Sequence, residues 1–257
     1  MVLLWLTGTP SEPRVDRPLS RGERSEPGAA RQCIRRVPEL RDPHAILGPV
    51  ASDPEPPIVG QPAPLFSLTS VQGGTIDLAT YRGRANVVVW FSRGFTCPFC
   101  RVYMDGMTEG YDGLREAGTE IIQVGPNLLQ AARTFFGHSP TPYPFVCDPD
   151  KRLFAVYGLG DRGALEATRS AVVSFSYAFT HGDTGPQLRG AWLDVMNRNF
   201  VRRLHHHAMT ALEQGIFLVD RSGVIRHRTV VGPTEPVPRG ESLARMVHAY
   251  CPGTPGA

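Results

Sequence analysis

A strand signal that leads into a C-x-x-C motif is the feature that most constrains this chain. Residues 86–91, Asn-Val-Val-Val-Trp-Phe, are almost all apolar and rich in β-branched side chains, as expected of a central strand covered on both faces. Cys97-Pro98-Phe99-Cys100 follow after a short loop, and residues 98–117 have helical character. A strand, a loop and a helix that opens at a cysteine pair indicate an α/β fold with the cysteines at one edge of the sheet.

Strand and helix signals alternate through the rest of the chain. Two pairs of short strands are separated by turn residues and predict β-hairpins, at 66–69 with 75–78 and at 216–220 with 224–227. Further strands are expected at 120–124 and 145–147, and helices at 128–136, 151–157 and 242–250. We therefore expect a central mixed β-sheet flanked by helices, with an N-terminal β-hairpin.

The composition divides the chain into three parts. Residues 1–57 hold ten of the 24 prolines, one aromatic residue, and eight arginines against eight acidic residues, which predicts a disordered Pro/Arg-rich tail. One domain is expected over residues 58–257. Residues 161–213 interrupt it with two helical stretches, 164–180 and 191–212. This insertion is interpreted as a helical pair packed on the sheet, with a lid or a homodimer face as the alternative.

Charge and hydropathy exclude several classes of protein. The 257 residues carry a formal net charge of +3, and the basic residues are scattered, so no nucleic-acid partner is expected. No apolar run reaches the roughly 18 residues of a membrane helix, so no membrane association is expected. Five cysteines are an odd number, unlike a secreted disulfide framework. These features predict a cytoplasmic protein.

The C-x-x-C motif is expected to carry the chemistry. At the start of a helix, free backbone N–H groups and the helix dipole stabilise an anion, and a thiolate there is a competent nucleophile. Pro98 suits the first helical position because it has no N–H to lose. Cys97 and Cys100 would then lie one turn apart, close enough for a disulfide. The alternatives are two inert buried thiols or half of a zinc site, but no second ligand pair follows, so no metal is expected.

The sequence around this motif resembles the alkyl hydroperoxide reductase / thiol-specific antioxidant (peroxiredoxin) family. The similar segments are Val59-Gly60-Gln61-Pro62-Ala63-Pro64 to Leu68, Tyr81-Arg82-Gly83, Arg93-Gly94-Phe95-Thr96-Cys97-Pro98-Phe99-Cys100, Tyr143-Pro144-Phe145, Asp148-Pro149-Asp150, and Gln214 to Asp220. The resemblance covers about residues 58–160 and 213–231, and it is closest to the peroxiredoxin-like branch with Cys-Pro-x-Cys. It implies a thioredoxin-like fold and thiol redox chemistry without a bound cofactor.

The resemblance also implies roles for single residues. Alignment of the peroxidatic cysteine on Cys100 places Cys97 where the family has a threonine, Arg93 where it has a proline, and Gln214 where it has an arginine. Cys100 would therefore become the sulfenic acid and Cys97 would resolve it to a disulfide. Arg93, Thr96, Pro98 and Gln214 are the expected supporting residues. Because Gln214 lacks the positive charge of the family's arginine, peroxidase activity is expected to be weak.

Three functions remain open at this point. The first is reduction of a peroxide through a Cys97/Cys100 dithiol–disulfide cycle, regenerated by a thioredoxin- or glutaredoxin-like reductant. The second is a thioredoxin-like protein dithiol–disulfide oxidoreductase, in which Cys97 attacks a disulfide substrate and Cys100 resolves the mixed disulfide. The third is a redox-inactive thioredoxin-fold protein that binds a partner through the insertion.

Other motifs are interpreted as structural. Gly158-Leu159-Gly160-Asp161-Arg162-Gly163 has the letters of a dinucleotide fingerprint, but a helix, not a strand, is expected before it, so Gly158 should end that helix. His205-His206-His207 would point in different directions on a helix and are expected to face solvent. Cys147 is expected to be a buried core thiol, and Cys251 has no expected role.

Overall fold

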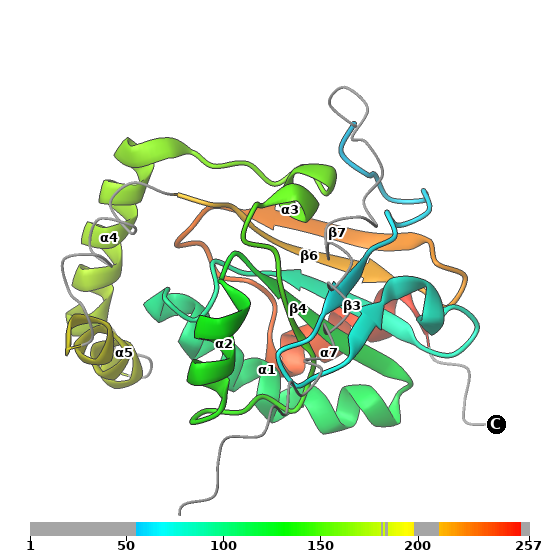
Figure 1. The fold of residues 1–257 in the computed structure, drawn as a ribbon, viewed down its shortest axis with the longest axis horizontal. Helices are drawn as coiled ribbons and strands as arrows, with labels where there is room; N and C mark the ends of the chain where they lie inside the picture. Colours follow the sequence, from blue (N-terminus) through cyan, green and yellow to red (C-terminus); the bar gives the residue numbers. More distant parts are fainter. Residues whose placement is uncertain (1–54, 181, 183–184, 198–210, 253–257) are drawn as a thin grey trace, which may run out of the picture. The chain divides into compact units, whose positions relative to one another are not determined.

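The computed structural model describes residues 55–180, 182, 185–197 and 211–252. Its main sheet has five strands in the order β5-β4-β3-β6-β7 (Figure 1). β3 pairs in parallel with β4, and β4 with β5, whereas β6 runs antiparallel to both β3 and β7. The strand bounds are β3 Asn86–Phe91, β4 Thr119–Gly125, β5 Phe145–Cys147, β6 Gln214–Val219 and β7 Ile225–Val231. The predicted mixed sheet is confirmed.

Helices lie on both faces of this sheet. They are α1 Pro98–Glu116, α2 Leu129–Phe136, α3 Arg152–Val156, α4 Gly163–Thr180, α5 Gly185–Asn197 and α7 Gly240–Tyr250. A separate hairpin consists of β1 Ser67–Thr69 and β2 Thr75–Asp77, followed by a 3-10 turn, η1, at Leu78–Tyr81. This confirms the N-terminal hairpin. None of the described helices combines the length and apolarity needed to cross a bilayer.

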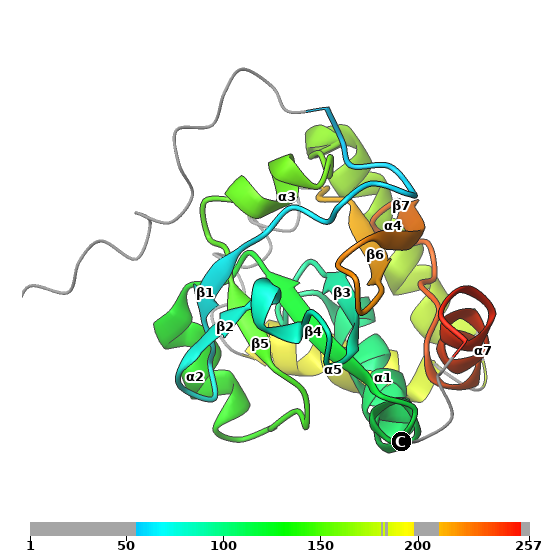
Figure 2. The same ribbon diagram turned by 90° about the vertical axis from the view of Figure 1, so that its right-hand side faces the viewer.

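β3 supplies side chains to two hydrophobic cores, because successive residues of a strand point to opposite faces. Val88 and Trp90 join the core beneath α1, α2 and α7. Val87, Val89 and Phe91 join the core beneath α3 and the N-terminal segment. Figure 2 shows α3 on one side of the sheet and α1 on the other. Burial on both faces explains why this strand carries an unbroken apolar run.

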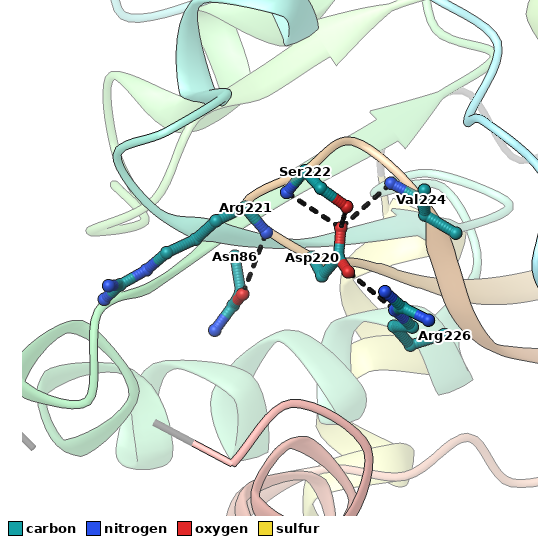
Figure 3. Close-up of polar contacts among 6 residues, drawn as sticks. All are labelled: Asn86, Asp220, Arg221, Ser222, Val224 and Arg226. Atoms are coloured by element: carbon teal, nitrogen blue, oxygen red, sulfur yellow. Dashed lines mark hydrogen bonds and ion pairs between the residues drawn. The ribbon is translucent and has the colours of Figure 1, made fainter. Parts of the chain in front are cut away.

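The turn between β6 and β7 is organised by one carboxylate, that of Asp220 (Figure 3). Its Oδ1 accepts hydrogen bonds from the backbone N–H groups of Ser222 and Val224, at 2.9 and 3.0 Å. Its Oδ2 accepts one from Arg226 Nε at 2.6 Å. The backbone N–H of Arg221 donates to Asn86 Oδ1 at 3.1 Å, which ties the turn to β3. Aspartate side chains commonly stabilise turns by accepting hydrogen bonds from backbone N–H groups of the same turn.

Several predicted bounds are wrong. α5 begins at Gly185, not at residue 191, because Pro186 fits the first turn of a helix. The predicted helix does not reach Leu212, which pairs with Asp161 in an isolated β-bridge; residues 198–210, including the three histidines, lie outside the described residues, as do residues 1–54. β6 begins two residues earlier than predicted, at Gln214, and β7 extends to Val231.

Gly158 ends the short helix α3, as predicted. It has a φ of +70° and directly follows the last turn of that helix, which is the conformation that a helix-ending glycine commonly takes. Asp148 binds the other end of α3, where its Oδ2 accepts hydrogen bonds from the N–H groups of Leu153 and Phe154. A helix therefore precedes the glycine-rich letters, and the dinucleotide interpretation stays rejected.

Candidate active site

The loop from β3 to α1 places the cysteine pair at the edge of the sheet. Cys97 is the N-cap residue of α1 and Pro98 is its first helical residue. The backbone N–H of Cys97 donates to the carbonyl of Gly94 at 3.2 Å, which closes a tight turn. Gly94 has a φ of +76°, a conformation that side chains with a Cβ rarely adopt. The proline and the glycine together determine where the helix starts.

A buried polar network holds this loop from beneath, and the sequence analysis did not identify it. Gln123 of β4 donates through Nε2 to Ser92 Oγ at 2.8 Å. Ser92 Oγ in turn accepts the backbone N–H of Gly94 at 3.2 Å. The Asn127 side chain packs so closely on Gly94 that a Cβ there would collide with it. The available signal was one polar residue inside a buried strand, Gln123 of β4, and another directly after a different strand, Ser92 after β3. Their pairing depends on the register of β3 against β4.

Both sulfurs of the motif are buried free thiols. The pKa of Cys97 is lowered to about 6, chiefly by a hydrogen bond from the Cys100 thiol. Burial opposes this shift, and the Arg93 charge and the backbone N–H groups of Cys100 and Phe99 add to it. These N–H groups belong to the first turn of α1, where an anion is stabilised. The site therefore favours a thiolate on Cys97 at neutral pH.

Cys100 shows the opposite behaviour. Its pKa is raised well above the ordinary range, first by burial and then by the hydrogen bond to Cys97 and the negative charge there. One turn into the helix, Cys100 has lost the free N–H groups that surround Cys97. The pair thus consists of one acidic thiol and one thiol that keeps its proton, which is the asymmetry that a dithiol nucleophile needs.

Gln214 of β6 lies beside this pair. Its side chain is fully buried, and its Oε1 accepts a hydrogen bond from Cys100 Sγ at 3.4 Å. Its Nε2 donates to the carbonyl of Pro233 at 3.3 Å. An acceptor at this distance supports the protonated form of Cys100, since it binds the S–H and not the thiolate. The structure thus brings together Cys97, Cys100 and Gln214 from α1 and β6.

Arg93 and Thr96, the other expected supporting residues, lie in the loop before Cys97. Both are half-buried. Arg93 lies close enough to lower the pKa of both cysteines through its positive charge. It also lines a small cavity with Cys97, whereas no described cavity involves Thr96. Arg93 therefore supplies positive charge beside the two cysteines.

The insertion covers the dithiol. The cavity beside Cys97 has a volume of about 10 Å³, and its opposite wall consists of small residues of α4 together with Trp192 of α5. The indole Nε1 of Trp192 donates to Ser174 Oγ at 3.0 Å, which joins α5 to α4. Ala178 and Leu188 are buried in the same core as α1. The helices of the insertion therefore pack over the start of α1.

The two other cysteines that the structure describes are poor nucleophiles. Burial raises the pKa of Cys147 to about 12 and that of Cys251 to about 11. Cys147 is only partly buried, at the end of β5. Within the residues that the structure describes, no group of three or more His, Cys, Asp or Glu side chains could hold a metal ion. Cys97 thus differs from every other described thiol in its acidity.

Comparison with known proteins agrees with this geometry. The sequence model of the AhpC/TSA family matches residues 59–176. This part of the chain resembles the AhpC/TSA family. The match includes β1 to β5, both cysteines and most of α4, but it ends before β6 and Gln214. The finer assignment to a Cys-Pro-x-Cys branch has no support beyond the residues themselves.

Curated relatives of this family are distant. A Mycobacterium tuberculosis protein provisionally named a peroxiredoxin is 27% identical over 99 residues, which are 38% of this chain and 62% of the relative. The thiol-disulfide oxidoreductase ResA of Bacillus anthracis is 27% identical over 110 residues, 42% of this chain and 62% of ResA. Peroxiredoxin Bcp of Escherichia coli K12 is 22% identical over 119 residues, 46% of this chain and 76% of Bcp. The chain therefore spans only about three fifths of the first two relatives.

Solved structures confirm the thioredoxin-like fold. AhpC of Enterococcus faecalis superposes with a TM-score of 0.52 at 14% identity, covering 75% of this chain and 92% of AhpC. Peroxidoxin BcpB of Mycobacterium tuberculosis gives a TM-score of 0.50 at 12% identity, covering 78% of this chain and 99% of BcpB. At these identities the similarity shows the fold alone.

Proposed function

We propose that this protein is a thiol-dependent oxidoreductase that reduces a peroxide by cycling Cys97 and Cys100 between dithiol and disulfide. The observation that supports it most is the pair of opposed pKa shifts, with Cys97 lowered to about 6 and Cys100 raised. A reactive thiolate beside a protonated resolving thiol is the arrangement that this cycle requires. The match of residues 59–176 to the AhpC/TSA family supports the same chemistry.

Cys97 is the first nucleophile in this proposal. The family alignment favours Cys100 as the first nucleophile, but Cys100 keeps its proton and donates it to Gln214. The helix N-terminus and the Arg93 charge instead stabilise a thiolate on Cys97. The Cys97 thiolate attacks one peroxide oxygen, an S–O bond forms, the O–O bond breaks, and the leaving hydroxide takes up a proton to become water. Cys100 then attacks the sulfenic sulfur and releases a second water. An external thioredoxin- or glutaredoxin-like dithiol returns both sulfurs to thiols.

A disulfide substrate is the second candidate. Two observations favour it: the acidic cysteine is the first of the motif, and position 214 is a neutral glutamine. The same Cys97 thiolate would attack a partner disulfide, and Cys100 would release the reduced partner. The resemblance to the named ResA proteins supports this reading. Partner binding without redox chemistry through the insertion is the third candidate, and a homodimer through that insertion is a further proposal.

We also propose that the protein works in a reducing compartment. Free thiols at all four described cysteines and an odd total of five are consistent with a reducing compartment, where thiols are kept reduced. We therefore place the protein in the cytoplasm.

The deciding experiment measures disulfide formation. Intact mass after mild peroxide should fall by two hydrogens in the wild type, with the change mapped to Cys97 and Cys100. Cys97→Ser and Cys100→Ser should abolish it, whereas Cys147→Ser should not. A sulfenate trap should label Cys97 in Cys100→Ser. If only Cys97→Ser is labelled, the order proposed here is reversed; if neither oxidant nor disulfide substrate changes this pair, the redox function is rejected.

A further inference from the structure

One buried hydroxyl beside the dithiol makes no hydrogen bond within the described part of the chain. Ser170 of α4 is 2% exposed, and its Oγ has no hydrogen-bond partner among the described residues. A buried hydroxyl without a partner destabilises the fold, so its presence calls for an explanation. Ser170 lines the cavity beside Cys97. Its hydroxyl is therefore available to whatever occupies that cavity.

The cavity has the chemistry of an oxygen-binding site. Arg93 and Cys97 line one side, and Ser170 lines the α4 side. The surrounding helix residues, Ala167 and Ala171, are small and offer no competing polar group. A volume of about 10 Å³ is close to the minimum that one water molecule occupies by this measure. The cavity therefore suits a molecule of very few heavy atoms, to which the Ser170 hydroxyl can donate a hydrogen bond.

Ser174 provides an internal comparison. It lies one turn further along α4, is 4% exposed, and lines the same cavity. Its hydroxyl already accepts a hydrogen bond from Trp192 Nε1 at 3.0 Å. The two buried serines thus differ in hydrogen bonding: the Ser174 hydroxyl binds Trp192, and the Ser170 hydroxyl has no partner among the described residues.

We propose that Ser170 and Arg93 form, with Cys97, a binding site for hydrogen peroxide, in which the Ser170 hydroxyl donates to the oxygen that leaves. This inference rests on the proposed function and names its substrate class: hydrogen peroxide, not bulky organic hydroperoxides. The hydroxyl and the guanidinium stabilise negative charge on the departing hydroxide as the O–O bond breaks and the Cys97 S–O bond forms. The neutral Gln214 contacts Cys100, so the α4 insertion, and not β6, supplies the donor at Cys97.

The test compares two oxidants in three proteins. The rate of Cys97–Cys100 disulfide formation is measured by stopped flow with hydrogen peroxide and with cumene hydroperoxide in wild type, Ser170→Ala and Ser174→Ala. We expect hydrogen peroxide to react at least about tenfold faster in the wild type, and Ser170→Ala to lower that rate about tenfold, the effect of one hydrogen bond made to a developing charge. Ser174→Ala should change it less than about twofold, because its hydroxyl serves Trp192.

Two further measurements separate the possible failures. Reaction with the neutral disulfide 2,2′-dithiodipyridine should be equal in wild type and Ser170→Ala, which shows an intact thiolate and an intact fold. Ser170→Thr, which keeps a hydroxyl, should retain more of the peroxide rate than Ser170→Ala. Equal peroxide rates in Ser170→Ala and wild type, or a wild type that prefers cumene hydroperoxide, would overturn this inference and leave the dithiol cycle standing. Absence of any peroxide-driven disulfide would instead reject the proposed peroxidase and this inference with it.

Discussion

Two cysteines one helical turn apart hold their protons very differently in this protein. Cys97 faces the unpaired N–H groups at the start of α1 and receives a hydrogen bond from its neighbour. Cys100 is buried, and it can donate its single S–H proton either to the Cys97 sulfur or to Gln214 Oε1. The same spacing that allows a disulfide therefore also separates the roles of the two sulfurs, because only one of them reaches the helix terminus.

Removal of the Cys100 thiol should raise the pKa of Cys97. The largest lowering influence on Cys97 is the hydrogen bond from Cys100, so Cys100→Ala should leave less thiolate at pH 7. Thiolate absorbance at 240 nm should titrate near pH 6 in the wild type and at a higher pH in Cys100→Ala, and iodoacetamide should react more slowly with the variant below pH 7. Cys147→Ser should leave the titration unchanged, because the Cys147 pKa is about 12. An unshifted curve in Cys100→Ala would show that the helix terminus and Arg93 suffice.

A positive charge at position 214 should speed formation of the Cys97–Cys100 disulfide. Gln214→Arg would place a cation within reach of Cys100 Sγ, where the neutral amide now lies at 3.4 Å. A nearby cation lowers thiol pKa values, so the Cys100 thiol should ionise more readily and attack the Cys97 sulfenic acid faster. Disulfide formation should speed up where this resolving step limits it, about tenfold for a Cys100 pKa that falls by one unit. Gln214→Glu should have the opposite effect on both quantities. If the wild type already reacts with peroxide as fast as efficient peroxidases do, Arg93 supplies the positive charge that Gln214 lacks.

At the scale of elements, what could be predicted from the sequence was local. β3, the cysteine motif and α1 were predictable because a buried strand, a proline at the first helical position and a helical apolar pattern follow one another in the chain. The Ser92–Gln123 network and the Asn127–Gly94 contact were not, since they depend on how β4 aligns with β3. The wrong start of α5 has a similar cause: the apolar spacing at Trp192 outweighed the helix-start signal of Pro186.

Gly94 should tolerate no side chain, whereas Gly113 should. Gly94→Ala would force a Cβ into the Asn127 side chain at a φ of +76°, and we expect it to lower the free energy of unfolding by about 2 kcal/mol or more. Gly113 is exposed in α1, and a Cβ there meets no atom within 4 Å, so Gly113→Ala should raise stability by up to about 1 kcal/mol. Urea denaturation of both variants measures the difference. Equal stabilities would mean that the loop can relax away from Asn127.

At the scale of the whole molecule, the insertion is the part that departs most from a simple sheet with flanking helices. The sequence suggested that the insertion either packs on the domain or closes over the site, and α4 has contacts of both kinds. It contributes Ala178 to the core around α1, and it also lines the cavity at Cys97. The sequence indicated helices here but not which face would meet the dithiol. Small residues at 167, 170, 171 and 174 were the available signal, and it has meaning only once α4 is placed against α1.

The packed part of the chain should begin close to Glu55. Composition predicts that residues 1–57 supply no core, yet Pro56 lies against Gly158 and Pro57 is buried. We therefore expect removal of residues 1–54 to change the melting temperature by less than about 2 °C, the effect of surface-level changes in a chain of this size. Removal of residues 1–58 should lower it further, because both prolines lose their packing. Thermal unfolding followed by circular dichroism, with peroxide-driven disulfide formation measured on the same samples, compares the two truncations. A large loss of stability in the shorter deletion would assign residues 1–54 a part in the fold, and equal melting temperatures would show that the contact of Pro56 with Gly158 contributes nothing.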